Sequence, residues 1–175
     1  MWLVVTLFPP NHTAEFRQPA VYATPRTDPR TIPITFDRSR STRGSAFANY
    51  SGIYMDPGLC NDWPNACEWI KWHERCHYLY LHDYDLKCDG SLNGENSADD
   101  YAVLHATAEQ TREAVAWFRW LHRSGYREIG THMQHLARAD RIESLLNAKL
   151  QTQTVSAESN KKRANSSINA HRKVR

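Results

Sequence analysis

The sequence predicts an α+β fold, in which a small antiparallel or mixed sheet precedes a core of about four helices. Between residues 31 and 55, short runs of β-branched and aromatic residues are separated by turn residues, which is the pattern of strands. From about residue 61 onward, apolar residues recur every three or four positions instead, as they do on one face of a helix. Strands gathered in one part of a chain and helices in the next are typical of the α+β class.

The chain of 175 residues is long enough for one domain and a tail. Residues 1–30 are rich in proline, threonine and arginine, and we expect them to form an extended N-terminal segment. Their apolar start is a poor signal peptide, so it is either the remnant of a targeting sequence or a first strand. Residues 31–150 are expected to form the folded domain. Residues 151–175 are polar and basic, have few apolar side chains to bury, and are expected to be a disordered tail.

Two strands are predicted ahead of the helices. Residues 31–36 are rich in β-branched side chains, and Pro33 suits an edge or an end of the sheet because it has no N–H to donate. Residues 45–55 show a fair alternation of side chains and are predicted to form one strand. The sequence Asp56-Pro57-Gly58 then predicts a turn.

Four helices are predicted after the strands, over residues 61–82, 93–106, 107–125 and 134–150. The first has a capping side chain before Pro64, and proline is well tolerated in the first turn of a helix. The third begins with Thr107 and Gln110, which have the spacing of a capping box, and Gly125 ends it.

The first helix carries His73-Glu74-Arg75-Cys76-His77, which has the pattern H-E-x-x-H. Residues four apart lie on one face of a helix, so both histidines can offer a ring nitrogen to the same metal ion. Glu74 lies on the flank of that face, where it can hold and deprotonate a metal-bound water. Two imidazoles and an open coordination position favour one Zn²⁺ per chain.

The second helix supplies further candidates for the same site. Glu95 and Asp99 are again four residues apart, in the pattern E-x-x-A-D. Glu95 is expected to be the third protein ligand of the metal. Asp99, one helical turn along, is expected to accept the free ring N–H of a ligating histidine. The polar stretch of residues 83–93 is expected to turn the chain so that the two helices are antiparallel.

The sequence HERCH followed by ENSADDYAV resembles the gluzincin metallopeptidases, the group that includes thermolysin. The E-x-x-A-D form is most similar to soluble bacterial relatives of the CAAX prenyl protease family, and the resemblance covers residues 46–148. It implies a zincin-like minimal metallopeptidase domain. The implied activity is that of a zinc-dependent metalloendopeptidase, in which a zinc-activated water attacks the peptide bond and Glu74 is the general base. The implied partner is a peptide or protein substrate.

The resemblance also implies substrate-contacting residues. Gly130-Thr131-His132 is similar to the T-H-P ending of the family, although Met133 stands where proline is usual. His132 is therefore the first candidate to stabilise the oxyanion, and four other residues stay open for that role: Arg138, Arg141, Tyr101 and His105. In this family the strand before the metal helix lies at the edge of the sheet and pairs with the peptide. The corresponding substrate-binding residues here are Phe47, Ala48, Asn49, Tyr50, Ser51, Gly52 and Ile53.

Each assignment has a structural alternative. His73 and His77 could be hydrogen-bonded core histidines, Glu74 a surface ion pair, and residues 47–53 an ordinary strand. Two motifs in the right order, each with the right spacing on a predicted helix, favour the metal site over these alternatives. A zinc-bound, non-hydrolytic interaction module is the alternative function, and the presence of Glu74 argues against it.

The four cysteines, at positions 60, 67, 76 and 88, surround the metal motif. They allow three complete pairings, and the sequence does not choose between bridges and free thiols. No apolar run approaches the roughly 20 residues that a membrane span requires. The net charge is +3, and the basic tail lacks interleaved aromatic residues, which disfavours nucleic acid as a partner. The compartment and the oligomeric state stay open.

Overall fold

The computed structural model describes residues 28–37, 46–82, 86–126 and 133–172. Within them a three-stranded mixed sheet is followed by five α-helices, which confirms the α+β class. The elements are η1 (Pro29–Thr31), β1 (Ile34–Phe36), β2 (Ala46–Asn49), β3 (Gly52–Met55), α1 (Pro57–Asp62), α2 (Pro64–His82), α3 (Leu92–His105), α4 (Ala108–Arg123) and α5 (His135–Arg172). The expected first strand near the N-terminus lies outside the described residues.

The sheet has the strand order β1-β3-β2, with β1 parallel and β2 antiparallel to β3. The prediction of one strand over residues 45–55 is therefore wrong, because β2 and β3 form a hairpin. Two local features turn the chain. The side-chain oxygen of Asn49 accepts the backbone N–H of Ser51 at 2.8 Å, and Gly52 has a φ of +146°, which other residues rarely adopt.

The hairpin changes which residues can form a substrate edge. Tyr50 and Ser51 lie in the turn, and Gly52 and Ile53 belong to the central strand. The backbone of β3 pairs with a strand on each side, so it has no free edge. Among the described residues, β2 pairs with β3 alone. Of the predicted edge, only Phe47, Ala48 and Asn49 therefore remain on an outer strand.

The sequence signals at helix ends agree well with the structure. The capping box of Thr107 and Gln110 is present at the start of α4, and α4 is followed by Gly125 at a φ of +74°. The short helix α1 was predicted as a turn. Its first turn is capped by Asp56, whose side chain accepts the N–H of Gly58 at 2.7 Å. The sequence Asp-Pro-Gly is common both in turns and at the start of a helix. Which of the two forms depends on the residues that follow.

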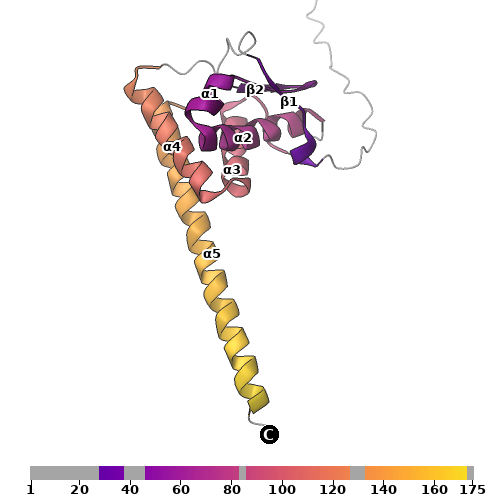
Figure 1. Cartoon of the computed structure of the whole chain (residues 1–175), viewed down its shortest axis with the longest axis vertical. Coiled ribbons are helices and arrows are strands. Elements are labelled where there is room, and N and C mark those ends of the chain that lie inside the picture. Colours follow the sequence, from indigo (N-terminus) through magenta and orange to yellow (C-terminus); the bar gives the residue numbers. More distant parts are fainter. Residues whose placement is uncertain (1–27, 38–45, 83–85, 127–132, 173–175) are drawn as a thin grey trace, which may run out of the picture.

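Helix α2 lies at the centre of the domain. Strands β2 and β3 pack against it, and so do α1, α3 and α4 (Figure 1). Its Trp69 is fully buried and meets Phe118 of α4 edge-on, with ring centroids 6.0 Å apart. Because α2 is covered on several sides, the polar residues His73 and Glu74 are held in the interior of the protein.

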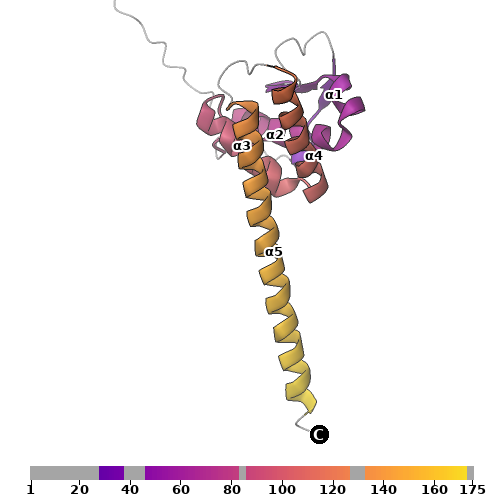
Figure 2. The ribbon, with the colours of Figure 1, turned by 90° about the vertical axis from the view of Figure 1, so that its left-hand side faces the viewer.

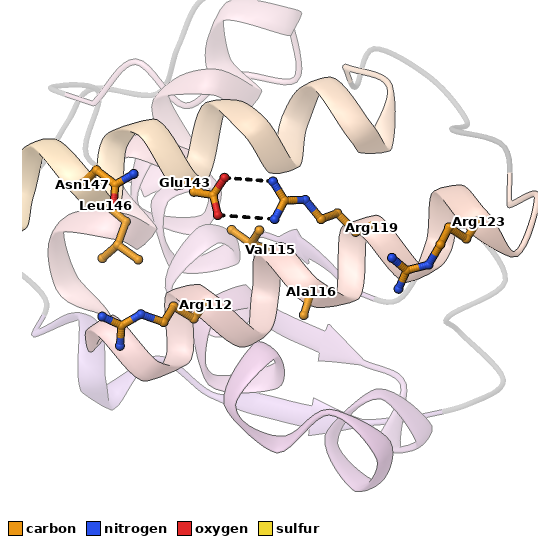
Figure 3. A pocket seen from close by; sticks show the side chains of 8 residues that line it. All are labelled: Arg112, Val115, Ala116, Arg119, Arg123, Glu143, Leu146 and Asn147. Carbon is orange, nitrogen blue, oxygen red and sulfur yellow. Dashed lines mark hydrogen bonds and ion pairs between the residues drawn. The ribbon is translucent and has the colours of Figure 1, made fainter.

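Exposed ion pairs join α5 to α4. The guanidinium of Arg119 contacts Asp140 at 3.0 Å and Glu143 at 2.8 Å, and Figure 3 shows the pair with Glu143. These residues lie beside a pocket of about 280 Å³ between α4 and α5. No residue of the two metal motifs lines this pocket, so it is separate from the candidate site. Packing holds the first turns of α5, which carry Arg138, because Ala139 and Ile142 are buried in the same core cluster as Phe118 of α4.

The prediction of a disordered tail is wrong for residues 151–172, because α5 continues through them to Arg172. Figures 1 and 2 show this half of α5 projecting from the rest of the domain. Residues 151–160 are all exposed, so tertiary packing does not explain the helix there. The chain beyond residue 130 has neither glycine nor proline, and it contains several strong helix formers. None of the described helices combines the length and apolar character that crossing a membrane requires.

Both cysteine pairs are disulfide-bonded. Cys60 of α1 is bridged to Cys67 of α2, and Cys76 of α2 is bridged to Cys88, which precedes α3. The chain has no free cysteine. The sequence left three pairings open, and the structure has the one that joins neighbours along the chain. Each bridge ties α2 to the segment on one side of it.

Candidate metal centre

The two histidines of α2 present their Nε2 atoms to one point. These atoms are 3.1 Å apart, and His73 is 2% exposed while His77 is partly buried. This is the arrangement that a four-residue spacing on a helix predicts. Two ring nitrogen atoms that face the same position in the interior of the protein can bind the same ion.

Glu95 of α3 completes the group. Its two carboxylate oxygens lie 3.1 Å from Nε2 of His73 and 3.4 Å from Nε2 of His77. One ligand atom from each of the three residues lies within 4.8 Å of the others, so His73, His77 and Glu95 could hold a metal ion. The sequence predicted this set of three.

The start of α3 is built to bring Glu95 close. The hydroxyl of Ser91 caps the helix by accepting the N–H of Gly94 at 3.1 Å. Gly94 is buried, and a Cβ on this residue would overlap the backbone carbonyl of Asp89. Only glycine allows the preceding loop to pass so near to the helix. The sequence alone does not indicate this role of Gly94, because the close approach of two backbone segments is visible only in three dimensions.

Each histidine is oriented through its other ring nitrogen. Nδ1 of His73 lies 2.9 Å from Oδ1 of Asp99, and Nδ1 of His77 lies 2.7 Å from the backbone carbonyl of Cys88. Both partners accept a hydrogen bond, so each Nδ1 carries the proton in the neutral ring. The lone pair is then on Nε2, which faces the centre of the group. Asp99 thus lies where the sequence predicts, and the Cys88 carbonyl carries no side-chain signal that sequence reasoning could use.

Asp99 is held in turn by Arg138 of α5. The guanidinium contacts Oδ1 at 2.7 Å through Nη2 and Oδ2 at 3.1 Å through Nε, and it lies over the ring of Phe118. Burial acts to raise the pKa of Asp99, but Arg138 and the hydrogen bond from His73 outweigh it and lower this pKa to about 2. Asp99 is therefore ionised at neutral pH. The sequence left Arg138 as a candidate for the oxyanion, and the structure places it on Asp99.

Glu74 is 7% exposed and belongs to the same buried turn of α2. Its negative charge acts on His77. Burial lowers the pKa of His77, but the hydrogen bond to Glu95 and the charges of Glu74 and Glu95 raise it to about 9. The carboxylates therefore favour a positive charge in the metal-free site, and at neutral pH the protonated ring of His77 carries this charge.

The remaining predicted residues are not gathered at this centre. His132 lies outside the described residues. Tyr101 and His105 pack on each other and on Trp72, which is about 100° around α2 from His73. Arg141 pairs with Asp100 and approaches Asp99 at 3.9 Å. None of these described residues supplies an atom to the group of three ligands.

No protein-family model matches this chain, and neither a curated protein nor a solved structure matches it. Its own elements define the fold, which is an α+β domain with a three-stranded mixed sheet. A function can be inferred here from the residues of the candidate centre and from their geometry.

Proposed function

We propose that this protein is a zinc-dependent metalloendopeptidase. The observation that carries the proposal is the convergence of His73, His77 and Glu95 within 4.8 Å, beside the buried Glu74. Two imidazoles and one carboxylate are a donor set of catalytic zinc sites that keep a fourth position open. A purely structural zinc site usually has four protein ligands, often cysteines, and the cysteines here are bridged instead. The residues present therefore fit Zn²⁺ in a catalytic role.

The roles of the side chains follow from their positions. Zinc, when bound, would supply Lewis acidity that polarises the scissile carbonyl and lowers the pKa of water. Glu74 takes the proton of the attacking water and passes it to the leaving amine, as a general base and then a general acid. Asp99, held by Arg138, keeps Nδ1 of His73 protonated and the ring in place.

The substrate is an extended peptide that pairs with β2. This strand packs against α2, and among the described residues one of its edges has no partner strand. Unpaired N–H and C=O groups of an edge strand grip a peptide backbone whatever its side chains are. The role assigned from the sequence to residues 47–53 is thereby narrowed to Phe47, Ala48 and Asn49.

Metal content and peptide cleavage, measured on the same preparation, test this proposal. The protein should contain about one zinc per chain and should cleave members of a random peptide library. A chelator should remove both the zinc and the cleavage, and added zinc should restore both. Protein that neither contains nor binds zinc would disprove the metal centre. Protein that binds zinc and cleaves nothing in the library would favour the non-hydrolytic module.

Zinc binding should release about one proton per chain at pH 7. The reason is that His77, with a pKa of about 9 in the metal-free site, is protonated at this pH, whereas a ligand imidazole must be neutral. The apparent affinity should rise about tenfold per pH unit between pH 7 and 9 and then level off. Calorimetry in two buffers with different heats of ionisation measures the proton count. Zinc binding without proton release at pH 7 would contradict the assigned role of His77.

A further inference from the structure

The two ligating histidines are oriented by partners of different kinds. His73 is held by the side chain of Asp99, which is itself fixed by Arg138 at 2.7 Å. His77 is held by a backbone carbonyl, that of Cys88, at 2.7 Å. Cys88 lies between α2 and α3 and belongs to neither helix. A backbone group in a connecting segment needs something else to keep it in place.

The disulfide between Cys76 and Cys88 supplies that constraint. Cys76 immediately precedes His77 in α2, and the Cα atoms of the two cysteines are 5.7 Å apart. The residue that offers the carbonyl is therefore bonded covalently to the neighbour of the residue that uses it. Both cysteines are buried, at 1% and 2% exposure, and they pack with Ala98 of α3 in a small cluster of their own. Leu86 and Tyr80 cover this cluster.

We propose that the Cys76–Cys88 disulfide is a positioning element of the metal centre. By holding the carbonyl of Cys88 against Nδ1 of His77, it fixes the tautomer and the direction of this ring, with Nε2 toward the ion. The oxidation state of the bridge then sets the affinity for the metal. This inference rests on the proposed zinc site, but it does not require that the protein be a peptidase.

Reduction of the bridge is a two-electron step. A phosphine reductant attacks one sulfur, the S–S bond breaks, and water supplies the oxygen of the phosphine oxide and the protons of the two new thiols. The segment that carries Cys88 is then no longer closed onto α2 across a separation of 12 residues. Holding its carbonyl in place now costs conformational entropy, so the hydrogen bond to His77 is made less often. Changes to such outer partners of a ligand lower metal affinity about 10- to 100-fold.

The second disulfide is a matched control within the same chain. Cys60 and Cys67 join α1 to the start of α2, with a sequence separation of 7, and Cys67 is also buried. Neither residue contacts a ligand histidine through a described hydrogen bond. Removing this bridge should lower the general stability of the domain and leave the metal centre as it is.

The experiment compares two double variants of the full chain, C76A/C88A and C60A/C67A, with the wild type. Zinc affinity is measured by competition with a chelator, the ligand geometry by the visible spectrum of the Co²⁺-loaded protein, and stability by thermal unfolding of the metal-free protein. Both variants should unfold at a lower temperature. Only C76A/C88A should lose about 10- to 100-fold in zinc affinity and show a changed cobalt spectrum.

Zinc binding by C76A/C88A within about twofold of the wild type, or an equal loss in C60A/C67A, would overturn the proposal. If C76A/C88A does not fold, the C60A/C67A variant, in which Cys76–Cys88 is the remaining bridge, is reduced with a phosphine. The phosphine is removed under anaerobic conditions, and the reduced variant is compared with the oxidised one by the same measurements. The same loss is expected, and unchanged affinity or a sulfur-to-cobalt band would overturn the inference. A wild-type protein that binds no zinc would instead refute the proposed function, so the two failures are distinct.

Discussion

Glu74→Gln should abolish peptide hydrolysis while the protein still folds and binds zinc. Glutamine has the size and shape of glutamate but cannot take a proton from water. Loss of a general base lowers the rate by a factor of about 100 to 10,000. Because Glu74 is buried and is not one of the three ligands, the ion should stay in place. The measurement is kcat/KM on a peptide from the library, with zinc content determined on the same sample.

A matched substitution in the same helix controls for the loss of one negative charge. Glu68 pairs with Lys71 on the outer side of α2, and 44% of its side chain is exposed. Glu68→Gln should leave kcat/KM within about twofold of the wild type, since a surface ion pair contributes little to the fold. If Glu74→Gln cleaves the peptide as fast as wild type, the base has been assigned to the wrong residue, even with zinc bound.

The elements that the sequence predicted well are those set by local chemistry. Helices α2, α3 and α4 follow from apolar spacing and capping residues, and the spacing of His73, His77 and Glu95 follows from the pitch of a helix. The turn between β2 and β3 was missed because Asn49 and Gly52 interrupt a run that alternates almost as a single strand does. The alternation of side chains over residues 45–55 indicates which of them face the core, and a tight turn in the middle of the run barely disturbs this alternation.

The features that the sequence could not supply are contacts between distant segments. Arg138 meets Asp99 across a separation of 39 residues, and no local pattern marks this pair. The carbonyl of Cys88 belongs to the backbone, so it carries no residue-type signal at all. The helix over residues 151–172 could not be predicted for a different reason. A polar segment with few apolar side chains to bury is typical of disorder, whereas here residues 151–160 are helical although they are exposed.

Loss of a ligand should lower zinc affinity more than loss of the residue that orients it. His73→Ala and His77→Ala should each reduce the affinity by more than about 100-fold, beyond the range found for outer partners. Glu95→Gln should also weaken binding, because a neutral amide is a poor ligand beside a carboxylate. Asp99→Asn should cost about 10- to 100-fold, since Nδ1 of His73 then faces an amide that can present its N–H side. Chelator competition gives the order of the four affinities.

The control for these variants is His122→Ala, which removes an exposed histidine at the end of α4 and should bind zinc as the wild type does. Circular dichroism of the metal-free proteins tells ligand loss from unfolding. His73→Ala keeps the pair of Arg138 with Asp99 and should remain helical, whereas Asp99→Asn leaves the guanidinium of Arg138 buried beside a neutral partner and should lower the unfolding temperature more. The two substitutions thus distinguish metal binding from structural support. His73→Ala should have the larger effect on zinc affinity, and Asp99→Asn should have the larger effect on the unfolding temperature. Undiminished zinc in both histidine variants would rule out the centre as described.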